Sequence, residues 1–122
     1  MKNNAIGFLV GSMALAASLA FAASAPFKIR MESWFPYYLP EAVSVGSGTV
    51  VRWENPTATH HTVTHDGCRE DGPCFFDSGP IPPSGVYEVP ELPPGRYPYH
   101  CRLHPIMRGV LVVTDARAGE ET

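Results

Sequence analysis

Hydrophobic and polar residues alternate over short stretches of this chain, and turn residues separate one stretch from the next. Alternation with a period of two is typical of β-strands that bury one face. The stretches with this pattern, or with a short run of β-branched residues, are 27–32, 42–45, 49–55, 61–65, 86–89, 95–101 and 109–115. All 13 prolines lie from residue 26 onward, which disfavours long helices because proline interrupts helical hydrogen bonding. We therefore expect an all-β protein with about seven to eight short strands.

The order of these stretches predicts an antiparallel β-sandwich, with the Greek-key connections that are the default in such folds. A small barrel has the same periodicity and stays open as an alternative. The Gly-Ser-Gly turn at 46–48 joins the stretches 42–45 and 49–55, and predicts that they form a β-hairpin. A long loop is expected from Asp66 to Ser84.

The N-terminal segment has a different composition from the rest of the chain. Lys2 precedes an apolar run at 5–22, and small residues follow this run, as in a secretory signal peptide. We expect a signal peptide at 1–22, with cleavage after residue 25 as the other option, one domain at 23–115 and a flexible tail at 116–122. A retained anchor is the alternative, because an apolar run of about 18 residues can span a bilayer. Export predicts a periplasmic protein with no stable membrane association after cleavage.

The overall charge excludes one class of partner. The chain has 9 lysines and arginines against 12 aspartates and glutamates, a formal net charge of −3 at pH 7. Such a chain has no basic stripe that would displace counterions from phosphates. We therefore expect no nucleic-acid binding, and we expect a monomer.

The three cysteines divide into a pair and a single residue. Cys68 and Cys74 lie in the short loop sequence GCREDGPC, where a disulfide would close a small loop in an oxidising compartment. Cys101 is then left without a partner. A free thiol is a liability in such a compartment unless something occupies it, and a metal ion would do so.

The surroundings of Cys101 contain further metal-binding side chains. The spacing Cys101-x2-His104-x2-Met107 places a thiolate, an imidazole and a thioether on one loop between two expected strands. A fourth ligand would come from the upstream sequence THHTVTH, which contains His60, His61 and His65. This loop and this histidine cluster together predict a metal centre.

The types of ligand indicate which metal is bound. Two histidines and one cysteine with a weak methionine are the ligands of blue copper electron-transfer sites, in which one ion cycles between Cu⁺ and Cu²⁺. Zinc more often takes four strong ligands and has no use for a thioether. We find no candidate general base and no second metal cluster in the sequence, so we expect that the protein is not an enzyme.

Four segments resemble the cupredoxins, the blue type 1 copper proteins of the amicyanin and plastocyanin type. They are YPYHCRLHPIMRGVLVV at 97–113, VVRWENPTATHHTVTHD at 50–66, FDSGPIPPSG at 76–85 and LPPGRYPYHC at 92–101. The resemblance extends from about Val43 to Thr114. It implies a Greek-key sandwich and a copper site with the ligands His61, Cys101, His104 and Met107.

The resemblance also assigns supporting residues. His60 is expected on the opposite side of its strand from His61, because neighbouring strand residues alternate between faces. The family commonly has asparagine after the first histidine ligand, and this chain has Thr62 at that position. The hydroxyl of Thr62 would still bond the backbone near Cys101, but threonine offers one hydrogen-bonding group fewer than asparagine. Asn55 would organise the turn before the first ligand. His65 and His100 are expected at the surface or in the second sheet.

For function, the resemblance implies a soluble electron carrier that meets a redox donor and a redox acceptor transiently in the periplasm. Docking is expected at an apolar patch that includes Pro105 and Ile106. Arg102 and Arg108 would rim it with positive charge, so that an acidic partner would bind less well as salt rises. The alternative is a periplasmic copper-binding and delivery protein, with a secondary site at His60, His65 and His100.

Overall fold

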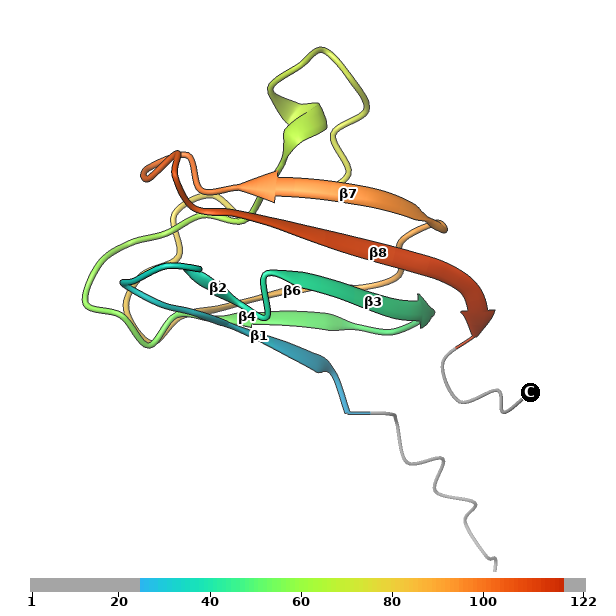
Figure 1. Ribbon diagram of the computed structural model, residues 1–122, viewed down its shortest axis with the longest axis horizontal. Coiled ribbons are helices and arrows are strands. Elements are labelled where there is room, and N and C mark those ends of the chain that lie inside the picture. The colour runs from blue at the N-terminus through green and yellow to red at the C-terminus, as the bar shows by residue number, and fades with distance from the viewer. Residues whose placement is uncertain (1–24, 118–122) are drawn as a thin grey trace, which may run out of the picture.

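Two β-sheets pack face to face in the computed structural model, which describes residues 25–117 (Figure 1). The expected signal peptide and residues 118–122 lie outside the described residues. The strands are β1 (Phe27–Met31), β2 (Tyr38–Leu39), β3 (Ala42–Ser47), β4 (Val51–Glu54), β5 (Thr64–His65), β6 (Val86–Val89), β7 (Gly95–His100) and β8 (Arg108–Arg117), with a 3₁₀ turn, η1 (Asp66–Cys68), after β5. The predicted all-β sandwich of seven to eight strands is confirmed. β8 continues two residues beyond the domain boundary expected at 115.

The strand order differs in detail from a purely antiparallel sandwich. One sheet has the order β2-β1-β4-β6 and the other has the order β3-β8-β7-β5. β1 pairs with β4 in parallel, and β3 pairs with β8 in parallel, whereas the other pairs are antiparallel. Both sheets are therefore mixed, because each contains one parallel pair, formed by β1 or β3, and two antiparallel pairs.

The hairpin predicted from the Gly-Ser-Gly turn is wrong. β3 and β4 follow each other in the chain but belong to different sheets. Gly48 adopts a positive φ of 87°, and the N–H of Thr49 donates to the carbonyl of Gly46 over 3.2 Å. This closed turn serves equally well as a corner between two sheets, and long-range pairing of β3 with β8 decides between the two uses.

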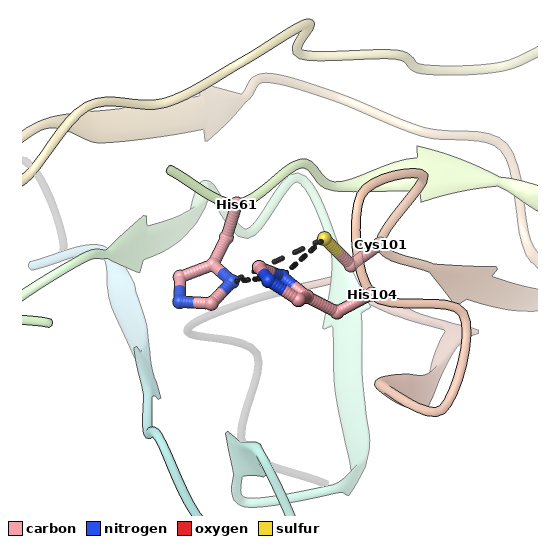
Figure 2. A group of neighbouring side chains, drawn as sticks. All are labelled: His61, Cys101 and His104. Atoms are coloured by element: carbon pink, nitrogen blue, oxygen red, sulfur yellow. Dashed lines mark hydrogen bonds between the residues drawn. The ribbon is translucent and has the colours of Figure 1, made fainter. Parts of the chain in front are cut away.

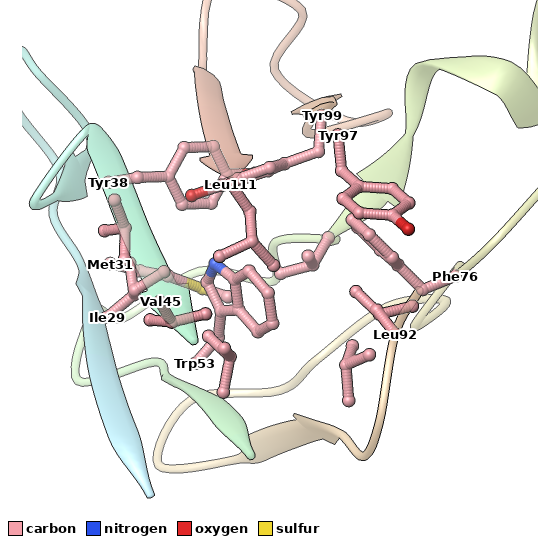
Figure 3. Close-up of a cluster of buried hydrophobic side chains, with 14 of the residues drawn as sticks. Ile29, Met31, Tyr38, Val45, Trp53, Phe76, Leu92, Tyr97, Tyr99 and Leu111 are labelled. Carbon is pink, nitrogen blue, oxygen red and sulfur yellow. The ribbon is translucent and has the colours of Figure 1, made fainter. Parts of the chain in front are cut away.

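Trp53 lies at the middle of the core between the sheets (Figure 3). Its ring centroid is 5.4 Å from that of Tyr99, and the ring of Tyr99 is 4.8 Å from that of Tyr38. The side chains of Trp53 and Tyr99 are both fully buried. Gly109 is needed beside them, since a Cβ at this position would lie 2.4 Å from the ring of Tyr99.

Three connections meet at one end of the sandwich. They are the segments 32–37 after β1, 55–63 after β4 and 101–107 after β7, which lie together at the left of Figure 1. Within residues 25–117, none of the helical structure has the length and hydrophobicity required to cross a bilayer. The gathering of these three connections brings the candidate ligands together.

Candidate metal centre

His61 is held by a backbone bridge rather than by a regular strand. Its N–H and C=O groups both bond Ile81, over 3.2 Å and 2.7 Å. The sequence predicted a strand over 61–65, but only Thr64 and His65 form one. The two bonds to Ile81 fix the backbone of His61 from the side of the long loop, so that its ring turns toward the 101–107 connection.

His61, Cys101 and His104 bring three donor atoms to one point, as Figure 2 shows. Nδ1 of His61 lies 3.1 Å from Nδ1 of His104, and Cys101 Sγ lies 4.0 Å and 3.8 Å from these two nitrogens. These three distances define a triangle whose corners lie about 2.1 Å from a common centre, close to the bond lengths of protein nitrogen and sulfur ligands to a divalent metal. The group therefore has the size and the donor types that one copper ion requires.

The far side of the His61 ring is fixed by two hydroxyl groups. Nε2 lies 2.9 Å from Oγ1 of Thr57 and 3.1 Å from Oγ1 of Thr59. Burial lowers the pKa of His61, and the neighbouring rings of His104 and His60 lower it further. A neutral ring that donates its Nε2 proton to a hydroxyl leaves the lone pair of Nδ1 directed at the metal position.

Asn55 organises the turn that carries these hydroxyl groups. Its buried Nδ2 donates to the carbonyls of Thr59, Ile81 and Pro82 over 2.8, 3.0 and 3.2 Å. Its Oδ1 accepts from the backbone N–H and the hydroxyl of Thr57. The side chain that the sequence assigned to the turn thus connects it to both neighbouring segments.

Cys101 is fully buried and contacts the His61 segment through Thr62. The backbone N–H of Thr62 donates to Sγ of Cys101 over 3.3 Å. The hydroxyl of Thr62 accepts from the N–H of Arg102 over 2.8 Å, the type of bond that the sequence suggested for it. Tyr38 donates its hydroxyl proton to the carbonyl of Thr62 over 2.6 Å. Thr62 therefore connects the two ligand-bearing segments by both its backbone and its side chain.

The 101–107 connection is closed by its own backbone. The N–H of Cys101 donates to the carbonyl of Met107 over 3.1 Å, and the N–H of Met107 donates to the carbonyl of His104 over 2.8 Å. Met107 is only 1% exposed. It lines a cavity of about 320 Å³ together with His61 and His104. Met107 therefore lines the same cavity as the two imidazoles.

The remaining histidines do not form a second cluster. His60 is exposed, although it lies outside the regular strands. His65 and His100 lie in the second sheet, which is one of the two locations expected for them, on β5 and β7, and they are only 8% and 2% exposed. His65 Nδ1 accepts from the N–H of Phe75, and His100 Nδ1 bonds Asp66. In the part of the chain that the structure describes, one group of histidine, cysteine or acidic side chains lies close enough together to hold a metal ion, and it consists of His61, Cys101 and His104.

The disulfide predicted from the loop sequence is present between Cys68 and Cys74. Cys101 is the free cysteine.

The two arginines expected at the rim of the docking patch are half-exposed, and each is paired with an acid. Arg102 lies 2.8 Å from Asp77, and Arg108 lies 2.5 Å from Asp66.

The sequence reasoning missed several residues that support the site. Thr57 and Thr59 stand four and two positions before His61, and a run of hydroxyl residues before a candidate ligand is the signal that would have indicated them. Asp66 and Asp77 lie in the long loop. No local pattern indicates their partners, which come from β7, β8 and the connection between them.

Comparisons with known proteins agree with this geometry. No family model matches the chain. Plastocyanin from Prochlorothrix hollandica is 28% identical over 99 residues, which are 79% of this chain and 76% of that protein. Structures of amicyanin variants in the Cu(I) and the oxidised state share 25% identity at a TM-score of 0.63, over 75% of this chain and 84% of theirs. A copper-containing nitrite reductase from Thermus scotoductus SA-01 shares the fold at a TM-score of 0.59, over 22% of its length.

The plastocyanin and amicyanin similarities cover 79% and 75% of this chain. Two histidine nitrogens and one cysteine sulfur around a single point are the donors of a blue copper site. The chain is a cupredoxin-like protein, and its group of His61, Cys101 and His104 could hold one copper ion.

Proposed function

We propose that this protein is a soluble type 1 copper electron-transfer protein that carries single electrons between periplasmic redox partners. The observation that carries the proposal is the group of His61 Nδ1, His104 Nδ1 and Cys101 Sγ, with separations of 3.1 to 4.0 Å. His61, Cys101, His104 and Met107 would be the ligands, with the thioether as the weak axial one. Copper bound by such a set supplies a one-electron couple between Cu⁺ and Cu²⁺.

The rest of the site favours a carrier over a delivery protein. The metal-binding atoms are held by hydrogen bonds with Thr57, Thr59 and Thr62, and Cys101 is fully buried. A rigid, buried donor set suits an electron carrier, because little rearrangement accompanies a change of oxidation state, whereas delivery requires release of the ion. We propose no catalytic residue.

Docking would take place where the ligand loop reaches the surface. Ile106 is 71% exposed and Leu103 is 50% exposed. Trp34 and Phe35 are each about 80% exposed and precede Tyr37, which lines the cavity beside His104. Arg102 and Arg108 are offset by Asp77 and Asp66, so the apolar side chains would contribute more to docking than the positive rim.

The visible absorption spectrum of the purified protein with one equivalent of Cu²⁺ tests the proposal, compared with Cys101→Ser. We expect an intense thiolate-to-copper band that is absent in the variant, because serine offers no thiolate. A colourless complex in the wild-type protein would overturn the proposal. Retention of the band in Cys101→Ser would contradict the role of Cys101.

Location in the periplasm rests on the apolar N-terminal segment. The mass of the protein purified from the periplasmic fraction of a bacterial host tests this part, since cleavage removes a defined number of residues. A full-length protein that stays with the membranes would contradict export as a soluble carrier.

A further inference from the structure

The carboxylate of Asp66 lies outside the ligand loop and contacts both residues that flank it. Its Oδ1 is 2.6 Å from Nδ1 of His100, and its Oδ2 accepts from Nη2 of Arg108 over 2.5 Å. His100 directly precedes Cys101, and Arg108 directly follows Met107. One side chain therefore joins the two ends of the 101–107 connection.

The two partners of Asp66 face each other across the sheet. His100 and Arg108 are the last register pair of β7 and β8 before the connection begins. Asp66 is 8% exposed and His100 is 2% exposed. The bond to His100 is buried on both sides, so water competes little for it, whereas Arg108 is half-exposed and adds a charge-assisted bond from the surface. These bonds hold the two ends of the connection that carries Cys101, His104 and Met107.

Asp66 is itself held by the disulfide-closed turn. It begins η1, whose last residue, Cys68, is joined to Cys74. Its carbonyl accepts from the N–H of Arg69 over 3.0 Å. A Cβ at Gly67 would lie 2.2 Å from the carbonyl oxygen of Pro73, so the two sides of the turn are in close contact. Figure 1 shows this turn standing above β7.

We infer that Asp66 is a positioning residue: it fixes the ends of the ligand loop through His100 and Arg108, and the Cys68–Cys74 disulfide fixes Asp66. The consequence for copper rests on the proposed function, but the restraint on the loop is a property of the copper-free chain. The two are therefore measured separately.

In the copper-free protein, Cys101 reports on the loop. It is the free cysteine among the 3 of the chain, and it is fully buried. The reaction of the Cys101 thiol with an aromatic disulfide such as dithiobis(2-nitrobenzoate) requires the loop to open. We expect Asp66→Ala to react about tenfold faster than wild type. Asp66→Asn keeps the shape of the side chain and an acceptor for His100, so we expect an intermediate rate.

The matched control is Glu88→Gln, which breaks the exposed pair with Arg52 on the other sheet and should react at the wild-type rate. Circular dichroism confirms that each variant is folded. If Asp66→Ala does not fold, Asp66→Asn decides the question. A wild-type rate in the folded Asp66 variants would overturn the inference.

With copper bound, we expect the Asp66 variants to release the ion about 10-fold to 100-fold faster, the usual cost of losing a group that orients metal ligands. The thiolate-to-copper band and the copper hyperfine splitting should shift as well, whereas a residue that only stabilises the fold would leave both unchanged. Arg108→Lys keeps a cation beside Asp66 and should retain most of the wild-type spectrum. Unchanged spectra and release rates in the Asp66 variants would overturn the inference.

The part played by the disulfide is tested with the double variant Cys68→Ser/Cys74→Ser. We expect thiol reactivity between those of wild type and Asp66→Ala. A wild-type rate would overturn the role of the disulfide. If the wild-type protein shows no blue band at all, the proposed function fails, while the thiol assay still tests the restraint on the loop.

Discussion

The backbone N–H of Thr62 donates to Sγ of Cys101 over 3.3 Å, although the two residues are 39 positions apart. The hydroxyl of the same threonine accepts from the N–H of Arg102. One residue thus connects the histidine segment to the ligand loop by two bonds with separable roles. The first bond affects the thiolate, and the second holds the backbone.

The bonds of the hydroxyl can be removed without the bond to the thiolate. Thr62→Ala keeps the N–H that points at Cys101 but leaves the N–H of Arg102 without its acceptor and removes the bond to the hydroxyl of Thr64. We expect the free energy of unfolding of the copper-free protein to fall by about 1–3 kcal/mol, measured by urea denaturation, with little change in the blue band. Thr62→Ser retains the hydroxyl and serves as the control. Equal stability of Thr62→Ala and wild type would contradict the role of these bonds.

Met107→Leu tests the axial ligand. Leucine has a similar volume, so the buried position stays filled and we expect a loss below about 1.5 kcal/mol. The variant lacks the thioether, which as the proposed axial ligand would donate electron density to Cu²⁺, so we expect a higher reduction potential, measured by voltammetry. Met31→Leu, at a buried core position that does not line the cavity beside His61 and His104, is the control. If both variants keep the wild-type potential, Met107 is not a ligand.

Ile106→Ala tests the docking surface. It removes an exposed apolar side chain from the ligand loop without touching a donor atom. We expect electron transfer with a protein partner to slow several-fold, because the contact loses apolar area, while the reaction with a small inorganic complex keeps its rate. Val86→Ala, an exposed position on β6, is the control. Equal slowing with both reagents would point to a change in the copper site instead of in docking.

The interactions of Asp77 predict that the folded protein loses stability in acid. Burial acts to raise the pKa of Asp77, but hydrogen bonds from Gly79, Arg102 and Thr64 outweigh it and lower the pKa. A carboxyl with a lowered pKa in the folded state stabilises the protein above its unfolded pKa of about 3.9, and this contribution is lost as pH falls through the folded value. Asp77→Asn should therefore be less stable than wild type at neutral pH, with a difference that shrinks below about pH 4. Urea denaturation of the copper-free proteins at several pH values measures this difference, and a constant difference across that range would contradict the prediction.

Local patterns in the sequence determined the class of fold and the chemistry of the site. Strand alternation and turn residues indicated the β-sandwich, because both can be recognised from residues that are neighbours in the sequence. The disulfide partners, six residues apart, were predicted for the same reason. The spacing of Cys101, His104 and Met107 placed three candidate donors on one loop, and the position of His61 came from resemblance to a known family.

Only the tertiary structure decided how distant segments combine. Whether β3 pairs with β4 or with β8 depends on which partner buries more of both faces, and the turn between β3 and β4 is compatible with either. The burial of His100 and its bond to Asp66 join residues 34 positions apart. Such contacts leave no periodic pattern in the sequence, since they arise where packed segments meet. The sequence by itself therefore specified the donor types, and long-range packing decided which residues hold them in place.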